Sequence, residues 1–260
     1  MSLAKAAAAL RAAPAADVPG VIGIMAALDG TLDDGDGFAW FNRLYRRVTE
    51  RVAAEMAKGG FEDIEFVGRL DVVFANYCFA ALRAYLEGAS TTPHAWLPLF
   101  QCNDKKGLAR VQFALAGMNA HINRDLMRAV VDVCAQRNVE PHLDSPQKRD
   151  FDKLNPLLGE VEAQVQAWYL KEDALVFEEA EGVLSSWSLA EARTNAWIHA
   201  EGLWAMPRPS PVTDLYLTGV DKFVGFANRQ LLVPLPKRSC LGRLLVRARA
   251  RATVPGGGTP

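Results

Sequence analysis

The stretch LARVQFALAGMNAHINRDLMRAVVDVCAQR, residues 108–137, decides the fold that this sequence predicts. Its apolar side chains recur at spacings of three and four residues, which is typical of one buried face of an α-helix. This face comprises Leu115, Met118, Ile122, Leu126, Ala129 and Val133. We therefore expect this segment to be the central helix of the domain.

Polar residues interrupt the middle of this predicted helix. His121 and Asp125 lie one turn apart at the edge of the apolar face, where side chains at positions i and i+4 meet. Asn119, Asn123 and Arg124 occupy the same turns. Because a mostly apolar helix does not require so many polar groups, we expect any functional site to lie here.

The same spacing of apolar residues predicts further helices on both sides of the central one. They cover about 18–30, 38–58, 64–86, 156–169, 171–184, 189–205 and 212–232. Residues 88–107 and 138–155 are predicted to be connections. No segment alternates polar and apolar residues for long enough to predict a strand. The fold class is therefore all-α, a single-domain bundle of about seven or eight helices with no significant sheet.

Residue types also predict details at two helix starts and on one helix face. Asp36 precedes a helix, where a carboxylate can accept hydrogen bonds from free N–H groups. Ser188 and Glu191 have the spacing of a capping box. In the last helix, the residues expected to be buried are Leu215, Val220, Phe223, Val224, Ala227 and Leu231.

The composition is that of an ordinary globular protein. Half of the 260 residues are hydrophobic and 23% are charged, so the chain can bury a sizeable core without disulfides. The four cysteines form no CxxC pair, which favours a reducing, cytoplasmic location. The net charge is −1, which is the sum of −7 on residues 1–229 and +6 on residues 230–260. Because the body is acidic, no nucleic-acid-binding surface is expected for it.

The two ends differ in composition from the rest. Residues 1–17 are rich in alanine and are predicted to be a flexible arm, followed by a helical domain over residues 18–236. Residues 237–260 carry six basic residues and no acid. As a helix this tail would be amphipathic and basic, which is a pattern of membrane-surface segments. Its Gly- and Pro-containing end favours disorder instead. No run approaches the roughly 18 apolar residues of a membrane span.

Four stretches resemble a known family. They are FVGRLDVVFANYCFAALRAY (66–85), FALAGMNAHINRDL (113–126), DSPQKRDFDKLN (144–155) and FVGFANRQLLVPL (223–235). The sequence is similar over residues 18–235 to a family of bacterial and fungal proteins labelled domain of unknown function 5995. AHINRDL is the most specific part of this resemblance. The resemblance implies a helical, cytoplasmic-type domain, and it implies no activity or catalytic residue.

His121 and Asp125 could act together in one of two ways. An imidazole nitrogen and a carboxylate one turn apart can hold a divalent transition metal, or can act as an acid–base pair. A metal would need further ligands, for which Asp71 and His199 are candidates because each interrupts an apolar helix face. Alternatively, the pair is structural, because buried polar groups need hydrogen-bond partners.

Three other residues are candidates for a substrate pocket. Asn119 lies beside His121 on the predicted central helix, and Trp197 and Trp204 flank His199 in the sequence. Pockets in helical bundles are mostly lined by apolar side chains. We therefore expect any ligand to be a small, largely apolar molecule.

The sequence leaves two functions open. One is a metal-dependent or acid–base enzyme with His121 as ligand or general base and Asp125 as its partner. The other is a non-catalytic helical ligand-binding or scaffold domain in which the His–Asp pair is structural. No GxSxG, GxxxxGK, GxGxxG or HExxH motif is present to identify a reaction. The oligomeric state is not predicted.

Overall fold

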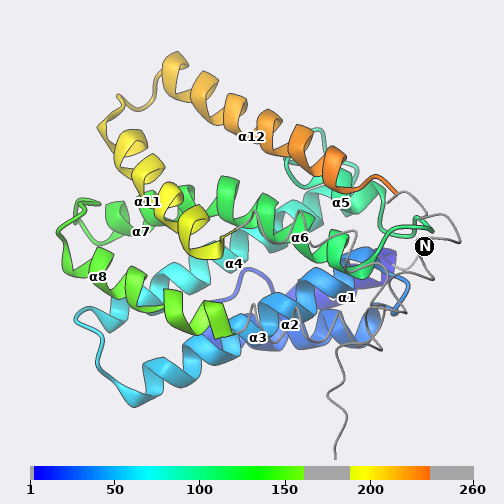
Figure 1. Ribbon diagram of the computed structural model, residues 1–260, viewed down its shortest axis with the longest axis horizontal. Coiled ribbons are helices and arrows are strands. Elements are labelled where there is room, and N and C mark those ends of the chain that lie inside the picture. The colour runs from blue at the N-terminus through cyan, green and yellow to red at the C-terminus, as the bar shows by residue number, and fades with distance from the viewer. Residues whose placement is uncertain (1–2, 161–187, 235–260) are drawn as a thin grey trace, which may run out of the picture.

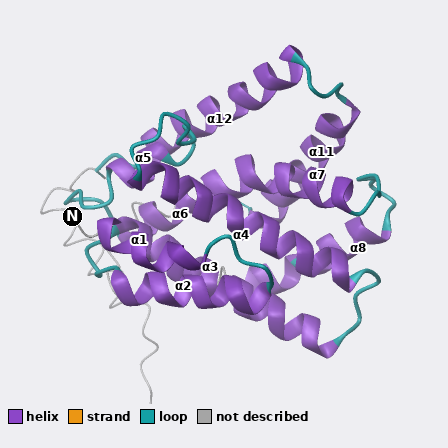
Figure 2. Cartoon of the chain, turned by 180° about the vertical axis from the view of Figure 1, so that it is seen from behind, coloured by secondary structure: helices purple, strands orange, loops and turns teal. Residues whose placement is uncertain are grey.

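Every element of the described chain is a helix. The computed structural model describes residues 3–160 and 188–234. No strand occurs within these two stretches, and Figure 2 shows only helices and loops. The predicted all-α fold is therefore confirmed.

The helices divide at the loop before the central segment. The first part of the chain forms η1 (Leu3–Lys5), α1 (Ala6–Ala9), η2 (Leu10–Ala12), α2 (Val18–Thr31), α3 (Gly37–Lys58), α4 (Ile64–Leu86) and α5 (Leu97–Gln101). The second part forms α6 (Arg110–Ala120), η3 (His121–Leu126), α7 (Met127–Gln136), α8 (Pro146–Lys153), α11 (Leu189–Ala205) and α12 (Pro211–Leu231).

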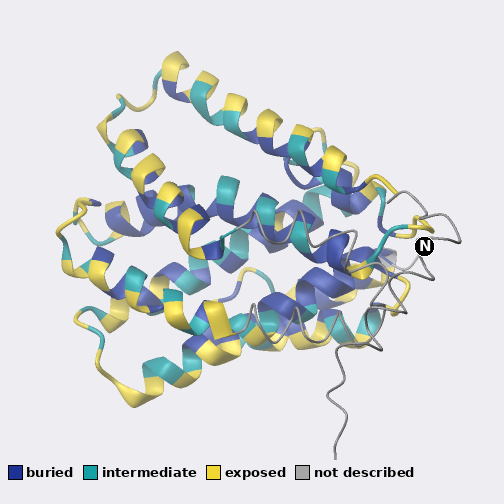
Figure 3. Cartoon of the chain, viewed as in Figure 1, coloured by how far each residue is buried: buried dark blue, intermediate teal, exposed yellow. Residues whose placement is uncertain are grey.

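The predicted central helix occupies the middle of the molecule. In Figure 1, α6 and α7 run between α2 and α3 on one side and α11 and α12 on the other. α6 packs against α3 and α12, and α7 packs against α4 and α11. The helix is buried on nearly all sides, as the dark segments of Figure 3 show, so its apolar stripe is wider than predicted.

The six residues from His121 to Leu126 form a π-helix, η3, between α6 and α7. A π-helix hydrogen-bonds from residue i to i+5 and is rare, and single π turns inside α-helices often mark functional sites. The π-helix η3 covers the residues HINRDL, which belong to AHINRDL, the most specific part of the family resemblance. The sequence predicted a helix here but did not predict this local widening.

The start of α3 is capped differently from the prediction. The Asp36 carboxylate does not bond the first N–H groups of α3, because its Oδ2 accepts from Asp33 N at 2.8 Å and its Oδ1 accepts from Asn103 Nδ2 at 2.7 Å. Asn103 supplies the cap instead. Its backbone oxygen accepts from Gly37 N at 2.7 Å, and its Oδ1 accepts from Phe38 N at 2.9 Å. Asp36 therefore acts by holding Asn103 in place.

Both predicted connections contain a short helix. α5 lies within residues 88–107, and α8 lies within residues 138–155. Ser145 begins α8, and its Oγ accepts from Lys148 N at 3.1 Å. Residues 155–160 are helical, which agrees with the start of the next predicted helix. The remainder of that helix, the helix predicted over 171–184 and the basic tail lie outside the described residues.

The predicted flexible arm is packed over its described part. Leu3, Ala6 and Leu10 are buried, and Arg83 of α4 donates to the backbone oxygens of Leu10 and Ala13 at 2.6 and 2.9 Å. Alanine side chains are small enough for the short helices to lie close to α2, which they contact. The residues from Leu3 onward are therefore part of the domain and not a loose arm.

The last helix has a face that contradicts the prediction. Ser188 caps α11 as predicted, with its Oγ accepting from Glu191 N at 3.2 Å. In α12, however, Leu215 and Phe223 are exposed. Figure 3 draws much of the outer edge of α12 in yellow, the colour of exposed residues. The residues of α12 that are buried are Thr213, Asp221, Val224, Gly225 and Asn228, so the prediction for Val224 is confirmed. Polar contacts with the segment before α5 and with the central helix, described below, account for the buried polar residues.

Two further observations concern the described residues. Cys78 and Cys134 are free, buried thiols that pack in the core, as their places in helical patterns predicted. None of the described helices combines the length and the apolar character needed to cross a membrane.

Candidate functional site

His121 and Asp125 form a pair in the interior of the protein. The His121 Nδ1 atom lies 3.1 Å from Asp125 Oδ2, and both side chains are fully buried. Trp96 Nε1 donates to the same carboxylate oxygen at 2.9 Å, and Arg124 Nη1 donates to Oδ1. The carboxylate thus has three donors, which satisfies the rule that a buried charge must be paired and hydrogen-bonded.

The surroundings fix the charge on each partner. Burial acts to raise the pKa of Asp125, but the charge of Arg124 and the bonds from His121 and Arg124 outweigh it and lower that pKa below its ordinary value. Burial lowers the pKa of His121, against the opposing effect of Asp125. Asp125 is therefore an ionised acceptor and His121 a neutral ring with its proton on Nδ1. That tautomer makes Nε2 a hydrogen-bond acceptor.

Aromatic rings enclose the imidazole. Phe74 stacks on His121 with ring centroids 3.5 Å apart, and Tyr45 meets it edge-on at 4.5 Å. The rings of Phe41 and Trp96 each lie 5.8 Å away. This packing fixes the orientation of the ring and keeps it in an apolar environment, which is the physical cause of its lowered pKa.

Two buried polar atoms in this part of the core have no hydrogen-bond partner within the described residues. They are His121 Nε2 and Asp71 Oδ2, whereas the Tyr45 and Thr49 hydroxyls interact with each other. Burial raises the pKa of Tyr45, and the nearby charge of Asp71 raises it further. Burial also raises the pKa of Asp71 to about 7. Asp71, predicted as a site residue, therefore lies in the neighbourhood of the His121 ring and is half-ionised near neutral pH.

Arg124 connects this pair to α12. Its Nε donates to Asp221 Oδ1 at 2.8 Å, while its Nη1 bonds Asp125. Asp221 also accepts from the backbone N–H groups of His94 and Ala95, at 2.8 and 3.1 Å. The sequence analysis missed Asp221, although a single acid inside the predicted buried run of the last helix was a signal.

Asn228 makes a second polar attachment of α12. It is fully buried, and its Nδ2 donates to the backbone oxygens of Ala95 and Ala116 at 2.8 and 2.9 Å. Its Oδ1 accepts from Asn119 Nδ2 at 2.8 Å, and Asn119 Oδ1 in turn accepts from Asn123 Nδ2 at 2.7 Å. The predicted pocket residue Asn119 therefore joins the central helix to α12.

A groove of about 450 Å³ lies between α11, α12 and the central helix. Its polar lining consists of Asn119, Asn123 and His199, and the rest is apolar or glycine. The remaining lining residues are Ala196, Gly219, Val220, Phe223, Val224 and Ala227. A ligand pocket of a few hundred Å³ with few polar groups is typical of small-molecule sites.

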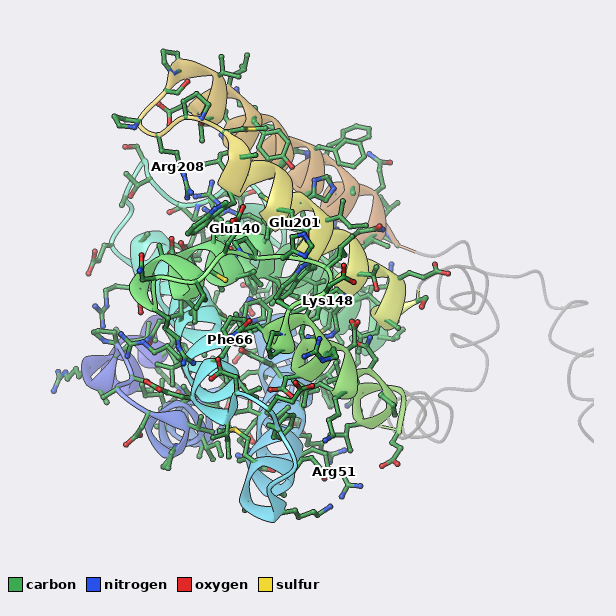
Figure 4. All side chains as sticks on the ribbon, turned by 90° about the vertical axis from the view of Figure 1, so that its left-hand side faces the viewer. Arg51, Phe66, Glu140, Lys148, Glu201 and Arg208 are labelled. Carbon is green, nitrogen blue, oxygen red and sulfur yellow. The ribbon has the colours of Figure 1, made fainter. Side chains whose placement is uncertain are left out.

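The two predicted pocket tryptophans do not line this groove. Trp197 is fully buried and packs against Phe151 and Phe66, with ring centroids 5.0 and 6.2 Å apart. Lys148 Nζ of α8 lies 5.9 Å from the centre of the Trp197 ring. Figure 4 labels Lys148 and Phe66, which contact this ring from α8 and α4. Trp204 lies under Arg208, whose guanidinium carbon is 5.4 Å from the ring. Neither tryptophan therefore shares the groove with Asn119.

The four residues predicted as metal ligands are not gathered into one set. His121 and Asp125 are paired, but His199 projects from α11 into the groove and hydrogen-bonds Tyr216 of α12. Within the part of the chain that the structure describes, no three His, Cys, Asp or Glu side chains lie close enough to hold a metal ion. The geometry of Asp71, His121, Asp125 and His199 therefore gives no support to a shared metal.

Comparison with known proteins agrees with the family resemblance seen in the sequence. The sequence model of a family described as "Family of unknown function (DUF5995)" matches residues 18–234. No match is found among curated proteins or among solved structures. The matched residues run from the start of α2 to just beyond the end of α12, and so include the His–Asp pair, the π-helix and the groove. Because this match covers far more than half of the sequence, the chain belongs to the DUF5995 family.

Proposed function

We propose that this protein binds a small, largely apolar molecule in the groove between α11, α12 and the central helix. The observation that carries the proposal is the lining of that groove, in which a pair of amides and His199 face a wall of apolar residues and glycine. Such a surface favours a ligand with an apolar body and one hydrogen-bonding group. A few fixed polar groups then determine orientation, and apolar burial supplies most of the affinity.

The amide pair has hydrogen-bonding capacity left for a ligand. Asn123 uses one N–H to reach Asn119, and Asn119 uses one N–H to reach Asn228. A carboxamide has two N–H donors and an oxygen acceptor. Asn123 Oδ1 accepts no bond from the described residues, so a hydroxyl or amide donor on the ligand would satisfy it. Asn119 is held by Asn228, which orients the pair in advance of binding.

His121 and Asp125 have a structural role in this proposal. The pair lies beneath the groove, and the groove-lining residues do not include it. A neutral, fully buried imidazole bonded to an ionised carboxylate fixes the first turn of the π-helix. Asn123 lies within the same π-helix, so its position in the groove depends on that anchoring.

A fluorescent apolar dye, anilinonaphthalene sulfonate, tests the groove directly. Ala227→Trp would fill the groove from α12, and we expect it to weaken dye binding at least tenfold, or about 1.4 kcal/mol. Ala190→Trp adds the same ring to an exposed position at the start of α11, outside the groove, and should leave binding unchanged. Equal dye affinity of the two variants would overturn the proposal.

An acid–base enzyme is the second candidate, and one observation favours it. Asp125 orients His121 through Nδ1 and leaves Nε2 as a buried acceptor without a partner among the described residues. A carboxylate that orients an imidazole in this way is how a general base is commonly prepared. Its substrate would again be small and largely apolar, since Phe74 and Tyr45 surround the ring.

Chemical access to His121 separates the two candidates. Diethyl pyrocarbonate acylates neutral imidazoles that it can reach, and peptide mass spectrometry reads each histidine separately. A catalytic base must be reached by a small molecule in the native state, whereas a structural one need not be. We expect modification of the exposed His199 and none of His121. Acylation of His121 in the folded protein would favour the enzyme.

A further inference from the structure

Helix α12 buries polar residues beside Val224 and exposes a row of large apolar residues on its opposite face. Asp221, Asn228 and Thr213 are buried, whereas the apolar side chains on the opposite face are 56–73% exposed. These exposed residues are Val212, Leu215, Phe223 and Phe226. Figure 3 shows the outer edge of this helix as a nearly continuous series of exposed turns.

The inner face explains how α12 is attached to the domain, but it does not explain why apolar residues lie on the outer face. Asp221 and Asn228 hydrogen-bond the segment before α5 and the central helix. Gln112 Nε2 donates to the backbone oxygens of Leu231 and Val233. None of these bonds requires an apolar residue on the opposite side. Isolated exposed apolar residues are ordinary, but a contiguous patch of several marks an interaction surface.

We propose that this outer face, Val212, Leu215, Gly219, Phe223 and Phe226, binds a second copy of the chain. The two α12 helices would lie antiparallel across a two-fold axis that passes at Gly219. This self-association goes beyond the proposed ligand binding. Gly219 and Phe223 also line the groove, but Val212, Leu215 and Phe226 do not, so substitutions at these three positions test self-association separately.

The spacing of the outer face is symmetric. Counted outward from Gly219, apolar residues lie four and seven positions away in both directions. An antiparallel pair centred on Gly219 therefore sets Leu215 level with the partner's Phe223 and Val212 level with the partner's Phe226. In a two-fold contact each residue meets its counterpart reciprocally, so the face must be complementary to itself. A lipid surface or an unrelated partner imposes no such symmetry.

Gly219 suits the crossing point. It lies inside α12, where glycine is unfavourable to a helix, and an added Cβ there would meet nothing within 4 Å. The described chain therefore gives no packing reason for a glycine at this position. A second helix crossing at Gly219 would give one, because two glycines let the backbones come close while the larger residues on either side interlock.

The area is sufficient for a specific contact. A fully buried phenylalanine removes roughly 150–250 Å² from water, so the four exposed side chains together present on the order of 500 Å². Two copies would then bury on the order of 1,000 Å², which is about the lower limit for a specific interface. The expected product is a dimer that dissociates on dilution and not a permanent one.

The experiment is sedimentation equilibrium of the full chain across low- to high-micromolar concentration. We expect a monomer–dimer equilibrium that Leu215→Glu and Phe226→Glu each weaken at least about tenfold, because each substitution buries one unpaired charge from each copy in the apolar contact. Leu143→Glu places the same charge on an exposed apolar position before α8 and should leave the dimer intact. Since both test positions are outside the groove, dye binding should survive in the resulting monomers.

The register is tested with Gly219→Cys. Under mild oxidation this variant should form a disulfide-linked dimer in high yield, and the unsubstituted chain treated identically should not. A chain that stays monomeric at every concentration, or a dimer indifferent to both glutamate variants, overturns the proposal. Pelleting of the monomer with anionic vesicles, abolished by the same glutamates, would overturn it in favour of a lipid surface.

Discussion

Arg124 on the π-helix donates through Nε to Asp221 on α12 at 2.8 Å, and the same guanidinium holds Asp125, the partner of His121. One buried cation thus links the interior His–Asp pair to the helix that forms one wall of the groove. The burial of Arg124 opposes its charge, but the two carboxylates raise its pKa above the ordinary value, so it stays charged. The attachment of α12 and the shape of the groove are therefore coupled to the π-helix.

Replacement of Asp221 should weaken the attachment of α12 and lower the free energy of unfolding. Asp221→Ala leaves two buried backbone N–H groups and one face of Arg124 without their acceptor. We expect a loss of about 3–4 kcal/mol in the free energy of unfolding, measured by urea denaturation. The control is Asp214→Ala on the exposed side of the same helix, which should change stability by less than about 0.5 kcal/mol. Equal losses would show that Asp221 is not an anchor.

Removal of the His121 ring should also destabilise the fold. His121→Ala leaves a cavity between Phe74 and Tyr45 and deprives Asp125 of one of its three donors. The expected loss is about 2–3 kcal/mol, from the cavity and the unsatisfied carboxylate together. His199→Ala, at an exposed position, is the matched control and should change the melting temperature little. An unchanged melting temperature for His121→Ala would show that its surroundings are hydrated.

Asp71 should make stability depend on pH. Its pKa is about 7 in the folded chain, because of burial, against roughly 3.9 in an unfolded one. Below pH 4 both states are protonated and the residue costs nothing. As the pH rises from 4 to 7, the unfolded state loses its proton first, so the native state becomes relatively less stable.

Asp71→Asn removes that dependence. The variant should equal the parent near pH 4 and should exceed it by on the order of 2 kcal/mol above pH 7. The full 1.36 kcal/mol per pKa unit is not expected, because the side chain is partly exposed. Urea midpoints measured between pH 4 and pH 8 test this. A difference between the two proteins that shrinks as the pH rises would contradict the assigned pKa shift.

Two glycines in the C-terminal helices should respond oppositely to alanine. A Cβ on Gly225 would lie 2.4 Å from the backbone oxygen of His94, which cannot move without shifting the start of α5. Gly225→Ala should therefore destabilise the protein by about 2 kcal/mol or more. Gly202→Ala in α11 meets nothing within 4 Å and should stabilise by about 0.5–1 kcal/mol, as alanine favours helices. Thermal melts of both variants decide the matter.

The sequence predicted most helices because their cores follow a simple period. α2, α3, α4 and the central helix bury the apolar residues that recur every three or four positions, and Ser188 caps α11 at the predicted place. His121 and Asp125 were found by the same logic, since i and i+4 side chains meet on any helix. Their mutual contact did not depend on the rest of the fold.

Other features depended on contacts between distant residues, which periodicity does not encode. Asn103 caps α3 across more than sixty residues, and Asp221 reaches the backbone of His94 from the other end of the domain. Because the hydrophobic pattern assigns polar residues to solvent, it predicted Leu215 and Phe223 to be buried in α12, although it predicted Val224 correctly. Trp197 was expected near Asn119, but the rotation of α11 directs it towards Phe151. The π-helix has no hydrophobic signature at all.

The polar contacts that attach α12, through Asp221 and Asn228, have a consequence for local unfolding of the protein. Most helices release a large apolar surface when they detach, so their opening responds strongly to urea. α12 is joined by hydrogen bonds and one ion pair as well as by Val224, and its largest exposed apolar side chains are already in water. In the monomer, amide hydrogens of α12 should therefore exchange through an opening that is nearly independent of low urea concentrations, while those of α6 and α7 should exchange only through openings that urea promotes.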